Sequence, residues 1–346
     1  MTYVGSKPTN IPLTSADIED GVVSAADLGA NSVDSSELVD GSIDTSHIGA
    51  LQVTGAKLNT DVISAQTALG ATPADTDELL VSDAGVLKRV DYSYLKSATI
   101  YRETLTPLIV NGDMAVSQRS TSVTGIGNGD SGYHTVDRFR YQEGATPGAV
   151  WTMAQDEIDS TDGGNAWAVG GHTRALKMSC TTADSSLDSG IVETIDTYLE
   201  KQNLKAFRKG SSGAKPFTLA FWIKSTKTGT NICELQDQSN DRAVSVAYTI
   251  SSSNTWEHKV LNFPADTTGA WTPNNQLGLK IRWYLTAGSE YQASSLQTAW
   301  AASATGKRAN GQVNNADSTS NNWHLTGAQL EVGEYTSSTL PPFQHE

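Results

Sequence analysis

Residues 217–224 read FTLAFWIK, and large apolar side chains occupy every second position of this stretch. The apolar side chains on one face are those of Phe217, Leu219, Phe221 and Ile223. Residues 277–285, LGLKIRWYL, repeat the pattern with Leu277, Leu279, Ile281 and Trp283. A period of two is typical of antiparallel strands that bury one face. Both stretches are therefore predicted to be strands that contribute to one core.

Further short runs of this kind flank the two stretches on both sides. They lie at 175–180, 244–250, 258–263 and 323–332, with turn-forming residues between them. One short helix is expected at 197–208, closed by Gly210. Many short strands without alternating helices indicate a β-sandwich or jelly roll. We therefore expect a mainly β protein in which residues 105–346 form a jelly-roll domain.

The N-terminal part has a different spacing of apolar residues. From Asp17 to Gln66 the chain consists of five gapless ten-residue repeats: DIEDGVVSAA, DLGANSVDSS, ELVDGSIDTS, HIGALQVTGA and KLNTDVISAQ. The second and seventh positions are always apolar, and these positions are Ile18, Val23, Leu28, Val33, Leu38, Ile43, Ile48, Val53, Leu58 and Ile63. Apolar residues five apart form neither a helical stripe nor one face of a strand. Each half-repeat is thus expected to bend separately and to return one apolar side chain to a common axis.

Residues 17–66 are not expected to fold alone. Two small apolar groups per ten residues cannot offset a backbone entropy cost of roughly 1–2 kcal/mol per residue. The natural partner is further copies of the same segment around a symmetry axis. The alternative is a disordered acidic linker, but disorder does not require that the spacing be kept over fifty residues.

Residues 67–104 connect the two parts. Helical character is expected at 65–74, before a hairpin with strands at 79–81 and 86–90 around the turn Ser82-Asp83-Ala84-Gly85. Residues 91–95 are expected to continue the strand, with Tyr92 and Tyr94 alternating.

The composition argues against several partners. The chain has 346 residues and a net charge of −14, with 38 acidic and 24 basic residues, and the basic residues do not cluster as nucleic-acid binding requires. No apolar run approaches the length of a membrane span, and no secretory signal follows Met1. Only two cysteines occur, Cys180 and Cys233, so at most one isolated disulfide is possible.

No motif points to catalysis or to a metal. The GxGxxG pattern at 127–132 precedes strand-like sequence rather than the helix a dinucleotide site needs. The histidines and cysteines are too widely spaced for a zinc site. Carboxylate pairs for glycoside cleavage could be sought at Asp156/Glu157, Glu193/Asp196 and Asp137/Glu143, yet such pairs arise by chance in an acidic chain. We expect no catalytic residue and no metal site.

Aromatic residues in polar loops are the candidate binding residues. Trp271 lies in the loop ADTTGAWTPNNQ, and Tyr291 and Trp300 lie in a long polar segment that also holds Lys307 and Arg308. Aromatic rings stack on the C–H faces of sugars, and the polar neighbours can bind hydroxyls or acidic sugars. These five residues are the predicted glycan contacts. The alternative for Trp300, and equally for Trp271 and Tyr291, is that the ring anchors its loop to the sandwich or to a neighbouring subunit.

Several segments resemble the tail fibres of tailed bacteriophages. YVGSKPTNIPLTSADIEDG and ELVDGSIDTSHIGALQVTGAKL resemble fibre stalks, and the hairpin resembles a module between stalk and head. LIVNGDMAVSQRSTS, YHTVDRFRY, FTLAFWIKST and WHLTGAQLEVGEYTSSTLPPFQ resemble a jelly-roll fibre head that is similar to carbohydrate-binding modules.

This resemblance implies a homotrimer located in the virion and exposed to the extracellular medium. Residues 1–16 would attach to a tail or baseplate protein, 17–66 would form the stalk, 67–104 a collar, and 105–346 the receptor-binding head. The head would bind a host surface polysaccharide or lipopolysaccharide. The resemblance also suggests a structural calcium near Asp113, although the simpler interpretation of this residue is an aspartate that caps a turn. The alternative functions are a polysaccharide-depolymerising tailspike and a purely structural fibre.

Overall fold

The protein is described from a computed structural model. It covers residues 14–30, 32–33, 38, 41–50, 52–59, 61–97, 106–159 and 169–345. Most of the expected attachment segment, 1–13, lies outside these residues. The chain divides into two units, Met1–Asp77 and Glu78–Glu346.

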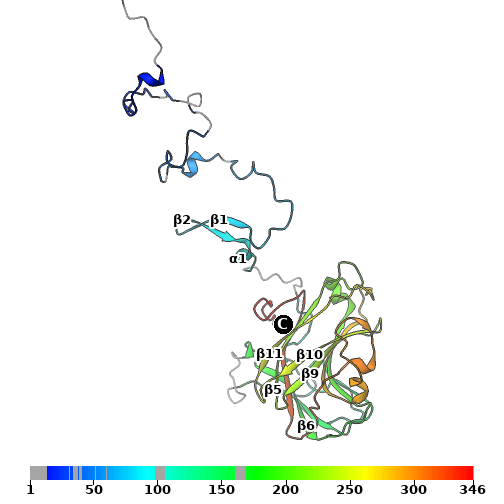
Figure 1. Ribbon diagram of the computed structural model, residues 1–346. Coiled ribbons are helices and arrows are strands. Elements are labelled where there is room, and N and C mark those ends of the chain that lie inside the picture. Colours follow the sequence, from blue (N-terminus) through cyan, green and yellow to red (C-terminus); the bar gives the residue numbers. More distant parts are fainter. Residues whose placement is uncertain are drawn as a thin grey trace, which may run out of the picture. The chain divides into compact units, whose positions relative to one another are not determined.

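The C-terminal region is a sandwich of two six-stranded antiparallel sheets. Sheet I has the order β13-β10-β9-β12-β7-β4. Its strands are β4 (Phe139–Gly144), β7 (Val192–Glu200), β9 (Gly229–Asp237), β10 (Arg242–Ile250), β12 (Leu277–Ala287) and β13 (Ala301–Ala302). Figure 1 shows strands β9 and β10 of this sheet near the middle of the sandwich.

Sheet II has the order β11-β8-β14-β6-β5-β3. Its strands are β3 (Ser122–Ile126), β5 (Val150–Glu157), β6 (Arg174–Thr182), β8 (Phe217–Ser225), β11 (Glu257–Phe263) and β14 (Asn322–Val332). The last strand of the chain thus lies in the middle of sheet II. The predicted mainly β sandwich is confirmed.

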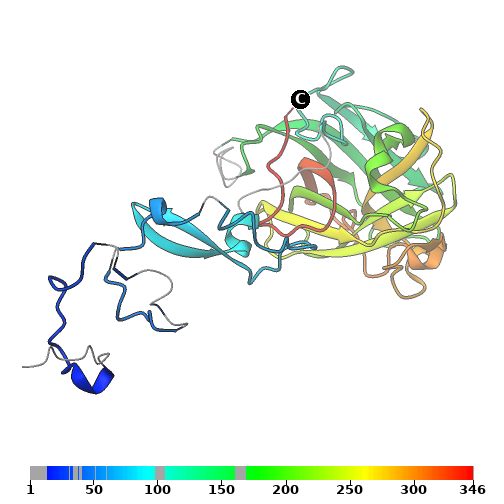
Figure 2. The same cartoon turned by 90° about the horizontal axis from the view of Figure 1, so that it is seen from above.

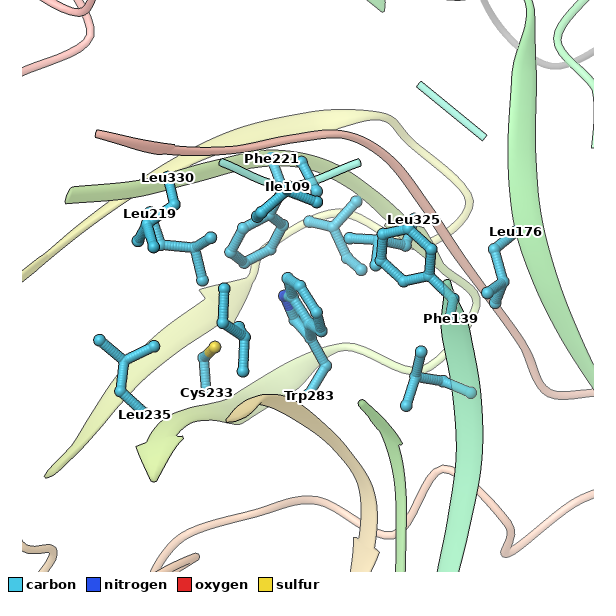
Figure 3. Packing of buried hydrophobic residues seen from close by; sticks show 14 of the residues in the cluster. Ile109, Phe139, Leu176, Leu219, Phe221, Cys233, Leu235, Trp283, Leu325 and Leu330 are labelled. Carbon is cyan, nitrogen blue, oxygen red and sulfur yellow. The ribbon is translucent and has the colours of Figure 1, made fainter. Parts of the chain in front are cut away.

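The core lies between the two sheets. Phe221 of β8 meets Trp283 of β12 edge-on, with ring centroids 5.8 Å apart and planes at 90°, and both side chains are fully buried (Figure 3). Phe139 of β4 packs on the same indole at 6.2 Å. The alternating apolar residues that predicted strands 217–224 and 277–285, apart from the half-buried Leu277, therefore lie in the core that joins the sheets.

One predicted helix is partly wrong. Residues 197–200 belong to β7, and only Lys201–Phe207 form a helix, which is of the 3₁₀ type. Strand β7 extends this far because it pairs with β12 up to Glu200 and Leu277. Tertiary pairing here overrides the local helical pattern.

The hairpin is present as β1 (Glu78–Asp83) and β2 (Val86–Asp91), which pair antiparallel with Asp83 opposite Val86, so the turn is shorter than expected and holds only Ala84 and Gly85 between the strands. Residues 92–97, however, form the helix α1 (Tyr92–Ser97) rather than a continued strand. The two tyrosines are therefore spaced along a helical turn.

In the N-terminal unit, backbone turns recur every five residues. One series donates from Asp17, Asp27, His47 and Lys57 to the carbonyl three residues earlier, and a second series donates from Val22, Ser32, Gln52 and Val62. In two repeats an aspartate also accepts from the first residue of its turn: Asp17 from Thr14, and Asp27 from Ser24. These hydrogen bonds match the expected bend in every half-repeat whose turn lies among the described residues. The helical character expected at 65–74 is absent from these residues, which are turn and irregular chain.

Every apolar side chain at the two repeat positions is exposed in the single chain. The exposed fractions run from 43% at Leu38 to 83% at Ile63. The single chain therefore offers these ten side chains no core.

Candidate functional site

A hollow of about 110 Å³ lies beside Trp271, where the chain leaves β7 and where the loop between β11 and β12 passes. It is lined by Lys201, Leu204, Lys205, Arg208, Lys209, Trp271 and Pro273. Trp271 is half-buried and packs against the main core. Of the five predicted glycan contacts, this residue alone lines this hollow.

Two segments form the walls of the hollow. The 3₁₀ helix Lys201–Phe207 ends at Arg208, which adopts a left-handed conformation with φ of 49°. Gly210 follows with φ of +83°, and a Cβ there would lie 2.3 Å from Cα of Ala270. Only glycine permits this approach, which brings the end of the helix against the loop that carries Trp271.

A buried charge network fixes that loop. The Nζ atom of Lys209 lies 2.6 Å from Oδ2 of Asp237 and 3.0 Å from Oδ2 of Asp266, and it donates to the carbonyl oxygen of Gly269 at 2.7 Å. Arg242 donates twice to Asp266, at 2.8 and 2.9 Å. Two cations thus balance two carboxylates below the hollow.

Both carboxylates are ionised. Burial alone would raise the pKa of Asp237, but hydrogen bonds from Lys209 and other donors hold that pKa below its usual value. Burial likewise opposes ionisation of Asp266, and Arg242 and Lys209 lower its pKa. Lys209 also lies 5.0 Å from the ring centre of Trp271 and 5.3 Å from that of Trp300. The indole of Trp271 is therefore held in place before any ligand binds.

The rim of the hollow is basic. Lys205 and Arg208 are exposed, and Lys201 is half-buried. Within the described parts of the chain, neither Lys205 nor Arg208 forms an ion pair. An apolar wall of indole, proline and leucine beside exposed cations suits a sugar ring that carries a carboxylate or phosphate. Sequence reasoning missed these cations, although their spacing on the expected 197–208 helix was a usable signal.

Trp300 is placed in the core instead. Its side chain is 9% exposed, its Nε1 donates to the carbonyl oxygen of Pro264 at 2.8 Å, and its ring packs against Phe217. Trp300 therefore anchors the long segment after β12, as the alternative interpretation held, and it offers no open ring face.

Tyr291 and Arg308 cover the outer side of sheet I. Tyr291 is half-buried against an apolar cluster that includes Ile232 and Tyr284. Arg308 donates to both carboxylate oxygens of Glu234 at 2.7 Å, and its pKa is raised although burial opposes the charge. Figures 1 and 2 show the segment 289–308, in orange, at the outside of the sandwich.

Lys307 is the exposed member of the set. It ends the 3₁₀ helix Thr305–Lys307. The five predicted contacts thus do not form one surface, because Trp300 is buried and Arg308 is paired.

The carboxylate pairs considered for glycoside cleavage are in structural contacts. Glu193 and Asp196 stand three residues apart on β7 and so project to opposite faces. Glu193 accepts from Tyr141 and Trp151 in the interior, whereas Asp196 accepts two hydrogen bonds from Arg282.

The other two pairs are also engaged. Asp156 binds Lys177 and His324, and Glu157 binds Arg174. Asp137 binds Arg119, and Glu143 accepts from the backbone of Gly129.

Asp113 lies near the C-terminus of the chain in space. Its Oδ2 is 3.2 Å from Nδ1 of His345. Among the described residues, no group of three or more His, Cys, Asp or Glu side chains is arranged to hold a metal ion. Cys180 and Cys233 are both buried and free, so the isolated disulfide that remained open is not formed.

Comparisons with known proteins give only distant structural likenesses. The chain is similar to TmCBM61 in complex with beta-1,4-galactotriose (9% identity, TM-score 0.29, covering 66% of this chain and 99% of that one). It is similar to the family 11 carbohydrate-binding module from Clostridium thermocellum (9%, 0.29, 62% and 96%) and to a family 29 carbohydrate-binding module (11%, 0.25, 61% and 88%). No protein-family model and no curated protein sequence matches the chain. At these values, the ligands of those modules are not carried over to this chain.

No helix among the described residues is long and apolar enough to cross a membrane.

Proposed function

We propose that this chain is a homotrimeric tail fibre protein of a tailed bacteriophage, and that its β-sandwich binds a glycan on the host surface. The observation that carries the binding function is the basic hollow beside Trp271. The N-terminal residues attach the fibre to a tail or baseplate protein, and the protein is located in the virion, exposed to the extracellular medium.

The repeat region supports trimerisation. Ten apolar side chains at five-residue spacing are exposed in the single chain, and turns return them at the same spacing. Burial of their exposed halves contributes on the order of 1 kcal/mol for each side chain. Three copies around one axis place these side chains together, which a single copy cannot do.

The hollow supports recognition of an acidic glycan. The indole of Trp271 offers contact with the C–H face of a sugar, and Lys205 and Arg208 offer charge-assisted hydrogen bonds to its acidic group. One such small site binds weakly. Three sites on one fibre raise the effective concentration, so that weak single-site binding becomes useful avidity.

We propose that the function is binding without catalysis. Each carboxylate considered for glycoside cleavage is engaged in a hydrogen bond or ion pair, and Glu193 and Asp196 point to opposite faces of β7. A depolymerase would instead present two carboxylates about 5–9.5 Å apart on one sugar.

The test is binding of the full chain to an array of bacterial surface polysaccharides and lipopolysaccharides. We expect retention on acidic glycans, loss with Trp271→Ala and with the double variant Lys205→Glu/Arg208→Glu, and no loss with the exposed control Lys307→Glu. Binding to no glycan would favour a purely structural fibre. Release of sugar fragments on prolonged incubation would establish the depolymerase.

A further inference from the structure

A second and larger hollow lies on sheet II, on the side away from the core. Its volume is about 240 Å³, and its main lining residues are His172, Trp222, His258, Gly327, Gln329 and Phe343. Two of them face each other across paired strands, since His258 of β11 is the register partner of Trp222 of β8. The C-terminal segment supplies the opposite wall through Phe343.

Two glycines and a bulge make room for this hollow. Strand β14 loses regular register with β8 between Thr326 and Gln329, and Gly327 in this bulge has φ of +60°. A Cβ on Gly327 would lie 2.5 Å from Nε2 of His172, and a Cβ on Gly170, whose φ is +66°, would lie 3.0 Å from Nε1 of Trp222. Bulges commonly re-aim side chains next to functional sites. The local backbone is therefore shaped around the two rings.

Two pairs of packed rings border the hollow. Trp222 and His258 have centroids 4.9 Å apart and planes tilted by 31°. Phe343 meets His172 edge-on at 4.6 Å and 89°. Trp222 and His258 are only half-buried, so part of this pair of rings is open to a ligand.

Two buried polar atoms at the wall of the hollow have no partner in the described structure. Nδ1 of His172, a side chain only 2% exposed, forms no hydrogen bond, and neither does Oε1 of Gln329. The amide nitrogen of Gln329 is already used, since it donates to the carbonyl oxygen of Pro341 at 3.2 Å. Unsatisfied buried polar atoms cost free energy, and each calls for an explanation, of which a ligand that completes the hydrogen bond is one.

The lining carries no acidic, lysine or arginine side chain. Burial lowers the pKa of His172 to about 4 and also lowers that of His258, so both imidazoles are neutral near pH 7. This electrostatic character is opposite to that of the hollow beside Trp271. The second hollow therefore offers no charged partner, and its lining suits a ligand without charge.

We propose that this hollow is a second ligand site that takes a single neutral pyranose unit. The C–H face of the sugar packs on the exposed part of the Trp222–His258 pair, and its hydroxyls bind Nδ1 of His172 and Oε1 of Gln329. A pocket with aromatic walls and a few placed polar groups is typical for a small ligand of this kind. The site is separate from the hollow beside Trp271, and it does not depend on the proposed role of the chain as a fibre.

The experiment is saturation-transfer NMR on the full-length protein with the methyl glycosides of galactose, glucose and mannose as probes. We expect saturable transfer to the ring C–H protons of at least one probe. His258→Ala should weaken binding about threefold, and Trp222→Ala about tenfold, because each removes a stacking surface. Trp271→Ala should leave binding unchanged, which separates this site from the basic hollow.

Thermal unfolding of each variant shows whether it is folded, and the half-buried His258→Ala decides the matter if Trp222→Ala does not fold. The proposal is overturned if no probe receives saturation from the wild type. It is also overturned if folded His258→Ala and Trp222→Ala bind as well as the wild type, or if Trp271→Ala removes binding of the neutral probes.

Discussion

The ammonium group of Lys209 lies 2.6 Å from the carboxylate of Asp237, and both side chains are completely buried. Lys209 comes just after the 3₁₀ helix that walls the basic hollow, whereas Asp237 ends strand β9 of sheet I. The pair, together with Asp266 and Arg242, connects the sheet to the loop that carries Trp271. The position of the proposed sugar-stacking ring therefore depends on charges that no ligand touches.

Removal of one partner from this network should strongly destabilise the folded protein. Asp237→Ala leaves the buried Lys209 with one carboxylate fewer, and we expect a loss of about 3–5 kcal/mol in the free energy of unfolding. Urea unfolding followed by tryptophan fluorescence measures it. The control is Arg119→Ala, which breaks the more exposed pair with Asp137 and should cost about 1 kcal/mol or less. Equal losses in the two variants would contradict the structural role of the network.

Gly210 should tolerate no side chain. In Gly210→Ala, the new Cβ would meet backbone atoms of Ala270 at 2.3–2.4 Å, at a φ of +83°. We expect at least about 2 kcal/mol of destabilisation, because both the strained backbone and the collision contribute. Gly213→Ala is the matched control, since its Cβ would meet nothing closer than 3.8 Å. Thermal unfolding compares them, and similar unfolding temperatures would count against the close approach.

Binding at the basic hollow should weaken with salt. Lys205 and Arg208 are exposed, so their attraction for an acidic glycan is screened as the Debye length falls from about 10 Å at 0.1 M to about 3 Å at 1 M salt. We expect a clear loss of affinity for an acidic polysaccharide over this range, measured by biolayer interferometry. In Lys205→Gln/Arg208→Gln, which removes the two charges without adding repulsion, the remaining binding should be weak and nearly insensitive to salt. An unchanged salt dependence in that variant would place the charge contacts elsewhere.

The proposed trimer should dissociate when charged residues replace apolar residues at the second and seventh positions of the ten-residue repeats. Leu28→Asp/Val33→Asp places two carboxylates at positions that are expected to meet their counterparts on the axis, and buried like charges oppose association. Analytical ultracentrifugation of the full chain should show a trimer for the wild type and smaller species for the variant. Ser32→Asp, next to the apolar position Val33, should remain trimeric. A monomeric wild type would end the stalk hypothesis.

The stability of the sandwich should fall as the pH drops from about 6.5 to about 4. Burial lowers the pKa of His172 from 6.5 to about 4, so the unfolded chain binds a proton there that the folded chain does not. His172 therefore does not lower the free energy of unfolding above pH 6.5. On acidification the free energy of unfolding falls, by on the order of 3 kcal/mol for this one group. His258 and His324 are shifted in the same direction.

The measurement is urea unfolding at pH 7 and pH 5 for the wild type and for His172→Gln. The variant should lose less stability between the two pH values, because it removes one of the groups that titrate. An equal or larger loss in the variant would contradict the assignment to His172.

Much of the secondary structure could be predicted from local spacing. Alternation in 217–224 and 277–285 identified strands, because the pleat of a strand sends successive side chains to opposite faces. The five-residue spacing from Asp17 to Gln66 likewise predicted a bend in each half-repeat, and turns recur at that spacing. Local spacing failed at 197–200, where pairing with β12 extends a strand, and at 92–97, where a helix follows β2.

The candidate binding residues could be predicted only in part from the sequence. Trp271, Tyr291 and Trp300 look alike in sequence, as aromatic residues in polar loops. Their roles differ because Trp300 lies between Phe217 and the buried Lys209, Tyr291 lies on sheet I, and Trp271 borders a hollow.

The sequence by itself determined that the chain has two parts, since a period of two and a period of five cannot belong to the same kind of structure. It also identified part of the core of the sandwich, through the alternating residues of 217–224 and 277–285, although it placed the buried Trp300 among the binding candidates. Only the tertiary structure decided which residues line the two hollows. Trp222 and His258 are 36 positions apart, and Phe343 comes much later still, yet strand pairing and the C-terminal segment bring them to one hollow. Contacts of that kind arise from the order of strands in a sheet, which no local pattern in the chain encodes.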